Sequence, residues 1–130
     1  MRPALFQQVL GVGSITNMPK IKAASSELQG TDVMEVGALV SAYRHIFVIG
    51  GSTRGIISFC IVKNSYTTND YSVYGSTQGL SVYTKNNIIY LQSFSGSLVR
   101  PIAWNIGANA NDTVTMSLVA ELPSDAVKIN

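Results

Sequence analysis

Hydrophobic and polar residues alternate along much of this chain, most clearly over residues 80–104. Three alternating runs are separated there by residues 85–87 (KNN) and 95–97 (SGS). Alternation with a period of two, bounded by Asn, Gly and Ser, predicts short antiparallel strands that are buried on one face. Asn tolerates a positive φ, which suits the first connection to a tight hairpin turn. We therefore predict a three-strand β-meander over this stretch.

Further strands are predicted on both sides of this stretch. Residues 36–43, 45–50 and 113–122 have strand patterns, and residues 55–63 (GIISFCIVK) are apolar on both faces. A strand that is apolar on both faces is typical of a central position in a sandwich or of a subunit contact. Pro101 predicts an edge position or a bulge for residues 98–104. About eight short strands predict an all-β fold, an antiparallel, jelly-roll-like β-sandwich.

The alternation also predicts which side chains share a face. In residues 45–50, Ile46 and Val48 oppose Phe47 and Ile49, and in residues 55–63 the three residues Ile57, Phe59 and Ile61 share one face. In residues 113–122 one face holds Val114, Met116, Leu118 and Ala120. Trp104 continues the face of Arg100 and Ile102, and we expect it in the core. The tail, residues 123–130, is polar and is expected at the periphery.

The N-terminal residues differ from the rest. Residues 3–10 predict a short helix, with Pro3 in its first turn and the pair Gly11 and Gly13 after its end. A helix of this length is unstable alone and needs a partner, such as another copy of the chain. Residues 20–35 are polar, with an edge strand around Ile21 and Ala23 and a turn at 30–32. We predict residues 1–35 as helix, linker and oligomerisation segment, and residues 36–130 as the β-sandwich domain.

Composition narrows the possible partners. The chain has 130 residues, enough for one domain, and only 12% are charged, about half of the roughly 25% expected of a soluble domain. Ser, Thr, Asn, Gly and Tyr replace the missing charge, as in sugar-binding faces and wide subunit interfaces. The formal net charge is +2, but the basic residues are scattered. This distribution argues against a nucleic-acid partner.

Several site classes are also excluded by the sequence. With a single cysteine, Cys60, and a single histidine, His45, the chain cannot form an internal disulfide or a structural zinc site. No apolar run approaches the roughly 18 residues that insert into a membrane, and residues 1–17 do not form a signal peptide. Phosphate-binding and dinucleotide motifs are absent. We therefore expect no metal, no cofactor, no membrane insertion and synthesis in a reducing cytoplasm.

Catalytic signatures are likewise missing. His45 is not spaced from Ser41 or Cys60 in any pattern that requires a nucleophile and base. The carboxylates fall mainly in predicted loops and strand ends, where solvent keeps their pKa values ordinary, whereas a glycosidase needs two that flank one sugar bond. We predict no catalytic residues and no enzyme activity. A polysaccharide depolymerase remains an alternative.

The tyrosine-rich stretch at residues 64–79 is the best candidate for recognition. Tyr offers a flat apolar face and a polar tip at low entropic cost, and Asn and Asp supply donors and acceptors for hydroxyl groups. The alternative is an edge strand whose tyrosines pack on a neighbouring copy. The predicted receptor-binding residues are Tyr66, Asn69, Asp70, Tyr71, Tyr74, Asn105, Asn109 and Asn111. The last three come from two later segments, which we expect to form a second edge of the same surface.

Residues 6–16 (FQQVLGVGSIT) are similar to the L-Q-x-V-L-x-x-G-N-x-T segment of many bacteriophage tail-fibre and receptor-binding proteins. The chain departs from that pattern at Phe6, Gly11 and Ser14. The resemblance implies a junction where three chains associate ahead of a β-rich distal domain, and hence a homotrimer in the virion that attaches it to a bacterial surface glycan or protein receptor. A structural virion component, such as a decoration or minor capsid protein, is the alternative.

Overall fold

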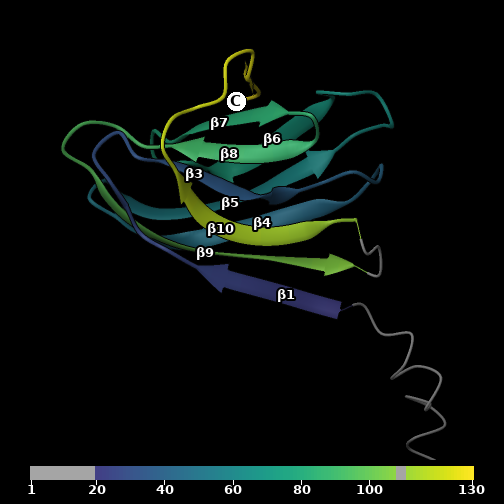
Figure 1. Ribbon diagram of the computed structural model, residues 1–130. Coiled ribbons are helices and arrows are strands. Elements are labelled where there is room, and N and C mark those ends of the chain that lie inside the picture. Colours follow the sequence, from purple (N-terminus) through teal and green to yellow (C-terminus); the bar gives the residue numbers. More distant parts are fainter. Residues whose placement is uncertain (1–19, 108–110) are drawn as a thin grey trace, which may run out of the picture.

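The computed structural model describes residues 20–107 and 111–130, and this part of the chain is all-β (Figure 1). It forms two antiparallel sheets, and the described residues contain no helix. The helix predicted at residues 3–10, with the segment that resembles tail fibres, lies outside the described residues. The strands are β1 Lys20–Ser25, β2 Leu28–Gln29, β3 Val33–Ala38, β4 His45–Ser52, β5 Gly55–Lys63, β6 Tyr71–Ser76, β7 Ser81–Lys85, β8 Ile88–Gln92, β9 Leu98–Gly107, β10 Thr113–Val119 and β11 Val127–Lys128.

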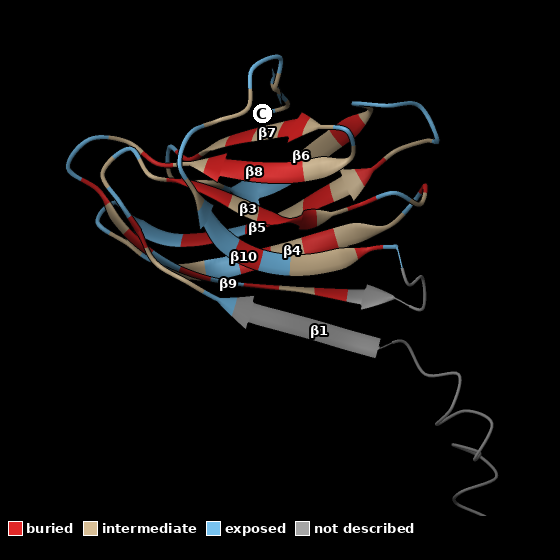
Figure 2. Ribbon diagram, in the orientation of Figure 1, coloured by how far each residue is buried: buried red, intermediate tan, exposed pale blue. Residues whose placement is uncertain are grey.

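The two sheets share one hydrophobic core. Sheet A has the order β1-β9-β4-β5-β6, with β2 paired to β9, and sheet B has the order β10-β3-β8-β7-β11. Buried residues of both sheets form a single cluster, which appears in Figure 2 as red bands on the strands. Its fully buried members include Met34, Val36, Leu91 from sheet B and Ile46, Val48, Ile61 from sheet A.

The predicted faces of β4 and β5 are confirmed. Ile46 and Val48 on β4 are buried, and so are Ile57, Phe59 and Ile61 on the neighbouring β5. The opposite face of sheet A is also largely apolar, although nothing in the described chain covers it. We call this surface the sheet A outer face; its described residues include Phe47, Ile49, Ile56, Cys60, Tyr74, Ile102 and Trp104.

The predicted meander is correct for its first two strands and wrong for the third. Asn86 and Asn87 both have positive φ, at 52° and 65°, and they join β7 to β8 in a tight hairpin. After β8, residues 93–97 carry the chain to the other sheet, where β9 pairs with β4 instead of β8. The alternation correctly predicts a buried face on β9, at Val99 and Ala103. It does not determine which sheet β9 joins, because both sheets border the same core.

Pro101 lies in the middle of sheet A, not at the expected edge. β9 is paired on both sides, and Pro101 is opposite Gly50 of β4. On the other side, the Pro101 carbonyl accepts a hydrogen bond from Ser26, between the end of β1 and the start of β2. In an antiparallel strand the N and O of one residue point to the same side. The nitrogen of Pro101, which carries no hydrogen to donate, therefore faces the interruption between β1 and β2, where no residue of either strand pairs with it.

A bulge overturns the predicted face of the last long strand. The pairing of β10 with β3 shifts between Val114 and Ser117, and Met116 has a positive φ of 50°. Met116 is buried, but Leu118 is 53% exposed. One extra residue in a strand reverses the direction of every later side chain. Leu118 and Ala120 therefore point to solvent instead of sharing the face of Met116.

Of three smaller expectations, one is wrong, one is correct in part and one is confirmed. Trp104 is half-buried and stacks on Phe47 at 5.4 Å on the sheet A outer face, so it is not in the core. The edge strand predicted around Ile21 and Ala23 is confirmed as β1, and so is the turn at 30–32, whereas β2 and the start of β3 show that this stretch is more than a linker. The tail is peripheral but ordered, because β11 pairs with β7 and Asn130 hydrogen-bonds the backbone of Leu80 and Val82.

The connections between strands gather at two ends of the molecule. We call the end with residues 39–44, 64–70, 86–87 and 111–112 the loop end; these segments contact one another through backbone and side-chain hydrogen bonds. The end with residues 30–32, 53–54, 77–80 and 93–97 is called the turn end. β1 begins at Lys20 opposite Gly107, so the chain enters sheet A at the loop end.

Candidate functional site

Lys63 connects the two largest segments of the loop end. Its carbonyl accepts a hydrogen bond from the Tyr43 backbone N–H at 2.7 Å, and its own N–H donates to Arg44 at 2.9 Å. Its side-chain Nζ donates to the Thr67 carbonyl at 3.1 Å. Segments 39–44 and 64–70 are therefore held together at one residue.

Segment 64–70 is ordered by its own polar side chains. The Asp70 carboxylate accepts hydrogen bonds from the Ser65 hydroxyl and from Asn64 Nδ2, and the Asn64 N–H donates to the Asp70 carbonyl. The bonds from Ser65 and Asn64 lower the pKa of Asp70 below its usual value. The Ser65 hydroxyl also accepts from the Thr67 N–H. The loop therefore has a defined conformation before any ligand arrives.

Two tyrosines project from this ordered end. Tyr66 is 82% exposed in segment 64–70, and Tyr43 is 74% exposed in segment 39–44. An exposed Tyr on a fixed backbone gives contact area with little loss of side-chain entropy. Tyr43 was assigned to a strand from the sequence, because the apolar run before it hides its turn geometry, a positive φ of 66°.

The other two predicted tyrosines have different environments. Tyr71 is buried, and its hydroxyl lies 2.8 Å from the Leu39 carbonyl oxygen and 2.9 Å from Asn87 Oδ1. Burial raises the pKa of Tyr71. Tyr74 is exposed on the sheet A outer face, next to Cys60. Tyr71 therefore has a structural position, whereas Tyr74 contributes to a different surface from Tyr66.

Of the three asparagines predicted to form the second edge of the binding surface, the structure places one at the loop end. Asn111 is exposed there, Asn105 is buried on β9, and Asn109 lies outside the described residues. The neighbouring Asp112 is buried instead: its Oδ1 accepts hydrogen bonds from Val40 and Ser41 backbone N–H groups. The structure thus brings Tyr66, Asn69, Asp70 and Asn111 together at the loop end. Tyr43 is a further residue of this candidate site, and the sequence did not reveal it.

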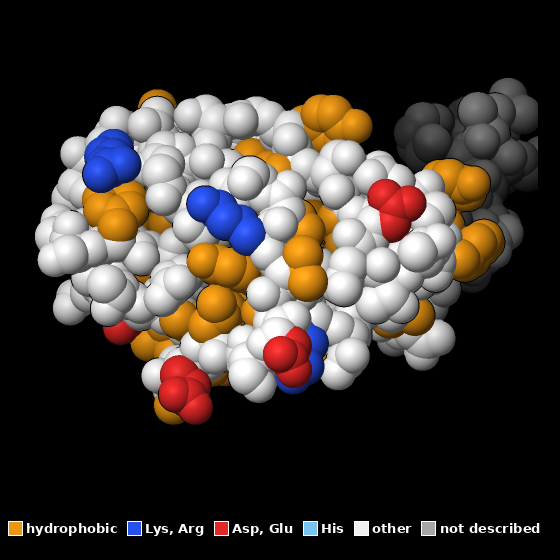
Figure 3. Space-filling view, turned by 90° about the horizontal axis from the view of Figure 1, so that it is seen from above, with side chains coloured by type: hydrophobic (Ala, Val, Ile, Leu, Met, Phe, Trp, Pro, Cys, Tyr) orange, Lys and Arg blue, Asp and Glu red, His pale blue; other side chains and the backbone are white. Residues whose placement is uncertain are grey.

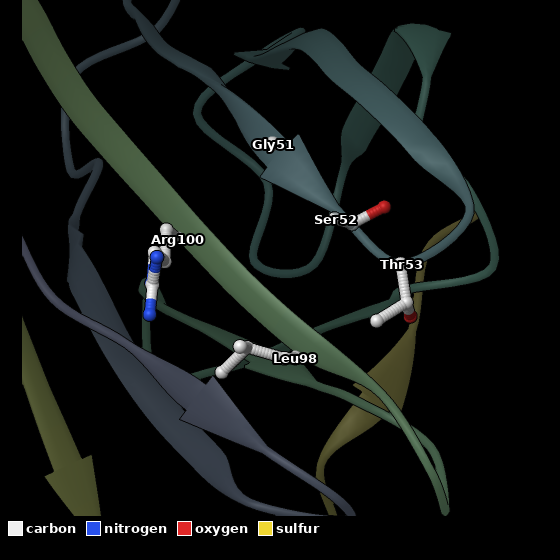
Figure 4. Close-up of a pocket in the computed structure, with 5 residues that line it drawn as sticks. All are labelled: Gly51, Ser52, Thr53, Leu98 and Arg100. Carbon is white, nitrogen blue, oxygen red and sulfur yellow. The ribbon is translucent and has the colours of Figure 1, made fainter.

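The turn end has a pocket that was not predicted. It has a volume of about 400 Å³ and lies between β9 and the end of β4, lined by Gly51, Ser52, Thr53, Leu98 and Arg100 (Figure 4). Arg100 Nε pairs with Glu27 at 2.8 Å, and this bond lowers the pKa of Glu27. Nearby, the Arg54 guanidinium lies 3.8 Å from the centre of the Phe94 ring. Arg100 is therefore the charged residue that lines the pocket, and it is exposed together with its partner Glu27.

The rest of the described surface offers little other site chemistry. Within residues 20–107 and 111–130, no three His, Cys, Asp or Glu side chains lie together as metal ligands. In the same part of the chain, no helix is long and apolar enough to cross a membrane. On the face in Figure 3, charged side chains are few within a mostly uncharged surface. Neutral polar and aromatic groups therefore carry most of the available recognition chemistry.

Comparison with known proteins gives no relative. No protein-family model, no curated protein sequence and no solved structure matches this chain.

Proposed function

We propose that this chain is a receptor-binding domain of the bacteriophage tail-fibre type. It attaches the virion to a bacterial surface receptor, either a glycan or a protein, through non-covalent contacts and without enzymatic activity. The N-terminal resemblance and the low charge of the chain support this role. In this proposal the two sheets form a jelly-roll-like sandwich that acts as a rigid support for the contact surface.

The exposed tyrosines of the loop end are the observation that carries the proposal. Tyr43 and Tyr66 are the two most exposed large apolar side chains among the described residues, and both stand on segments fixed through Lys63. Asn69 and Asn111 are exposed at the same end and offer amide groups. An aromatic face beside neutral donors and acceptors matches the apolar faces and hydroxyl groups of a sugar.

We also propose that the domain works as a homotrimer. The sheet A outer face supports self-association, because Ile49, Ile56 and Ile102 are exposed on the same face and a contiguous apolar patch marks an interaction site. Three copies on one appendage raise the avidity of a weak site when the geometry permits simultaneous contact. Native mass spectrometry measures the assembly directly; a monomer at micromolar concentration would contradict this part of the proposal.

The central experiment replaces both exposed tyrosines. Labelled Tyr43→Ser/Tyr66→Ser protein is compared with wild type for binding to a panel of bacterial cells and a glycan array. We expect binding to weaken by about 30-fold or more, because exposed tyrosines at the centre of an interface are typical hot spots. Leu118→Ser is the matched control, since it removes an exposed apolar side chain from β10, away from the loop end. Unchanged binding by the folded double variant would exclude the loop end.

A structural virion component is the second candidate, and the sheet A outer face favours it as well. In that role the face would be buried against other virion proteins. Binding to purified particles but not to cells would support this alternative. Release of reducing sugars from bacterial polysaccharide by the purified protein would instead contradict a non-enzymatic role.

A further inference from the structure

Lys63 is buried at the loop end in a way that is unusual for a lysine. It is the last residue of β5 and only 1% of its surface is exposed. A buried Lys is normally paired with a carboxylate, yet no carboxylate of the described chain lies within ion-pair distance of its amine. Both oxygens of Asp70, a nearby carboxylate, are occupied by Ser65 and Asn64. Burial lowers the pKa of Lys63, although the Asp70 carboxylate acts in the opposite direction, so loss of the proton from the amine is easier than in water.

The amine is directed at one side-chain amide. Lys63 Nζ lies 3.0 Å from Asn87 Oδ1 and 3.1 Å from the Thr67 carbonyl, and it is 4.7 Å from the centre of the Tyr71 ring. The Tyr71 hydroxyl lies 2.9 Å from the same Asn87 Oδ1. Asn87 is held by the hairpin turn between β7 and β8, and its carbonyl accepts the Leu39 N–H. A nucleophile and a hydrogen-bond donor therefore converge on one carboxamide.

We propose that Lys63 and Asn87 form an intramolecular isopeptide bond. The lone pair of the uncharged Nζ attacks Cγ of Asn87, and negative charge develops on Oδ1. A proton passes from the attacking nitrogen to the amide nitrogen, the Cγ–Nδ2 bond breaks, and ammonia leaves. One C–N bond forms and one breaks, with no oxidant, reductant or further reactant.

The neighbouring side chains match the needs of this reaction. The Tyr71 hydroxyl is placed to donate to the developing oxyanion. Burial, and more weakly the Asp112 carboxylate, raise the pKa of Tyr71, so the phenol stays protonated as a donor. The Asp112 side chain is itself buried; its Oδ2 accepts no hydrogen bond from the described residues and lies 3.9 Å from Arg44 Nε in a long ion pair. Fixed neighbours in a water-poor site favour amide exchange through proximity.

The bond would join the two sheets covalently. Lys63 belongs to sheet A and Asn87 to the hairpin of sheet B, 24 positions apart in sequence. The chain has one cysteine and cannot build an internal disulfide. Like a disulfide, an isopeptide bond would lower the conformational entropy of the unfolded chain. Unlike a disulfide, it is not cleaved by reductants.

Mass spectrometry of the folded, full-length protein tests the proposal. We expect an intact mass about 17 Da below the sequence mass, which is the mass of the released ammonia. A protease digest should contain one branched peptide that joins Lys63 to Asn87. A succinimide at an asparagine gives the same mass change without joining two peptides, so the branched peptide decides. Protein that folds and retains the full sequence mass, with no branched peptide, would overturn the proposal.

Variants separate the cross-link from other effects. Lys63→Met should keep the full sequence mass, whereas the control Lys85→Met should still lose ammonia. Among the described residues, Lys85 Nζ donates to the backbone carbonyl of Ser124 and to no side-chain amide. Tyr71→Phe should slow the mass loss by about 100-fold if its hydroxyl holds the oxyanion. If Lys63→Met does not fold, a chemically synthesised wild-type chain that has never folded supplies the test: its loss of ammonia should begin only after the denaturant is removed and the chain folds. Loss of ammonia at the same rate in denaturant would contradict the assigned geometry.

Discussion

The two ends of the molecule use polar residues in opposite ways. At the loop end, the polar groups Lys63, Tyr71 and Asp112 are buried and bonded to the backbone, while aromatic side chains face solvent. At the turn end, the Arg100–Glu27 pair lies in solvent, beside an open pocket. The loop end therefore has an internal framework that fixes its surface, whereas the turn end has charged contacts that solvent weakens.

This difference bears on which end contacts a receptor. A buried polar network gives the loop end a preorganised surface, and this favours it as the contact site. The direction of the chain favours the other end, because β1 begins at the loop end and the preceding residues are attached there. If those residues lead to the rest of a fibre, the turn end points away from it. Experiments that affect one end at a time are therefore the most informative.

The largest expected effect is on stability and comes from Asp112. Asp112→Ala removes the acceptor of the Val40 N–H at 2.8 Å and of the Ser41 N–H at 3.3 Å in a buried setting. We expect a loss of about 2–3 kcal/mol in the free energy of unfolding, measured by urea denaturation. Glu27→Ala at the turn end is the control and should have no measurable effect, because its partner is solvent-exposed. Equal sensitivity at both ends would remove the distinction between them.

A smaller effect is expected from acid. The folded-state pKa of Asp70 is lowered, so its stabilisation of segment 64–70 is complete above the unfolded pKa, about 3.9, and is lost as the pH falls through the lower folded value. NMR should show segment 64–70 becoming mobile as the pH falls through the lowered folded-state pKa of Asp70, while the strands of sheet B remain ordered. Asp70→Asn should remove this pH dependence. A segment equally rigid at pH 2 and pH 6 in the wild type would show that the carboxylate does not hold it.

The smallest expected effect is at the pocket. A side chain at Gly51 meets open space, so Gly51→Leu fills the pocket without a clash. We expect this variant to bind cells as well as wild type does, because in the proposed function the loop end makes the contact. Ser117→Leu is the matched control, an exposed position on β10 of sheet B, outside both the pocket and the sheet A outer face. If Gly51→Leu abolishes binding while Tyr43→Ser/Tyr66→Ser retains it, the turn end is the receptor site.

Local structure was predictable from the sequence where neighbouring residues decide it. The turn at Asn86 and Asn87 and the inward faces of β4 and β5 follow from residue type and period. The strand that pairs with β9 cannot be predicted in this way, because a strand with one buried face fits either sheet around a shared core. The bulge at Met116 was also hidden, since a Met with positive φ has no sequence signal. Long-range pairing, not local pattern, separates the prediction from the structure.

The candidate site was predictable only as a region. The tyrosine-rich stretch does lie partly at the surface, but alternation along β6 buries Tyr71 and exposes Tyr74. The sequence could not reveal Tyr43, which joins Tyr66 only because backbone hydrogen bonds to Lys63 bring segment 39–44 alongside. The buried amine of Lys63 was equally hidden, because its neighbours Asn87 and Thr67 come from two different connections.

Cys60 provides a reporter for the sheet A outer face. It is the sole thiol of the chain and lies half-buried between Phe47 and Tyr74 in the strand register. Burial raises the pKa of its thiol, so alkylation will be slow even in a free subunit. Covering the face with other subunits would slow alkylation further, and dilution would restore the rate. The concentration dependence of a thiol-labelling time course can therefore follow assembly without any engineered probe.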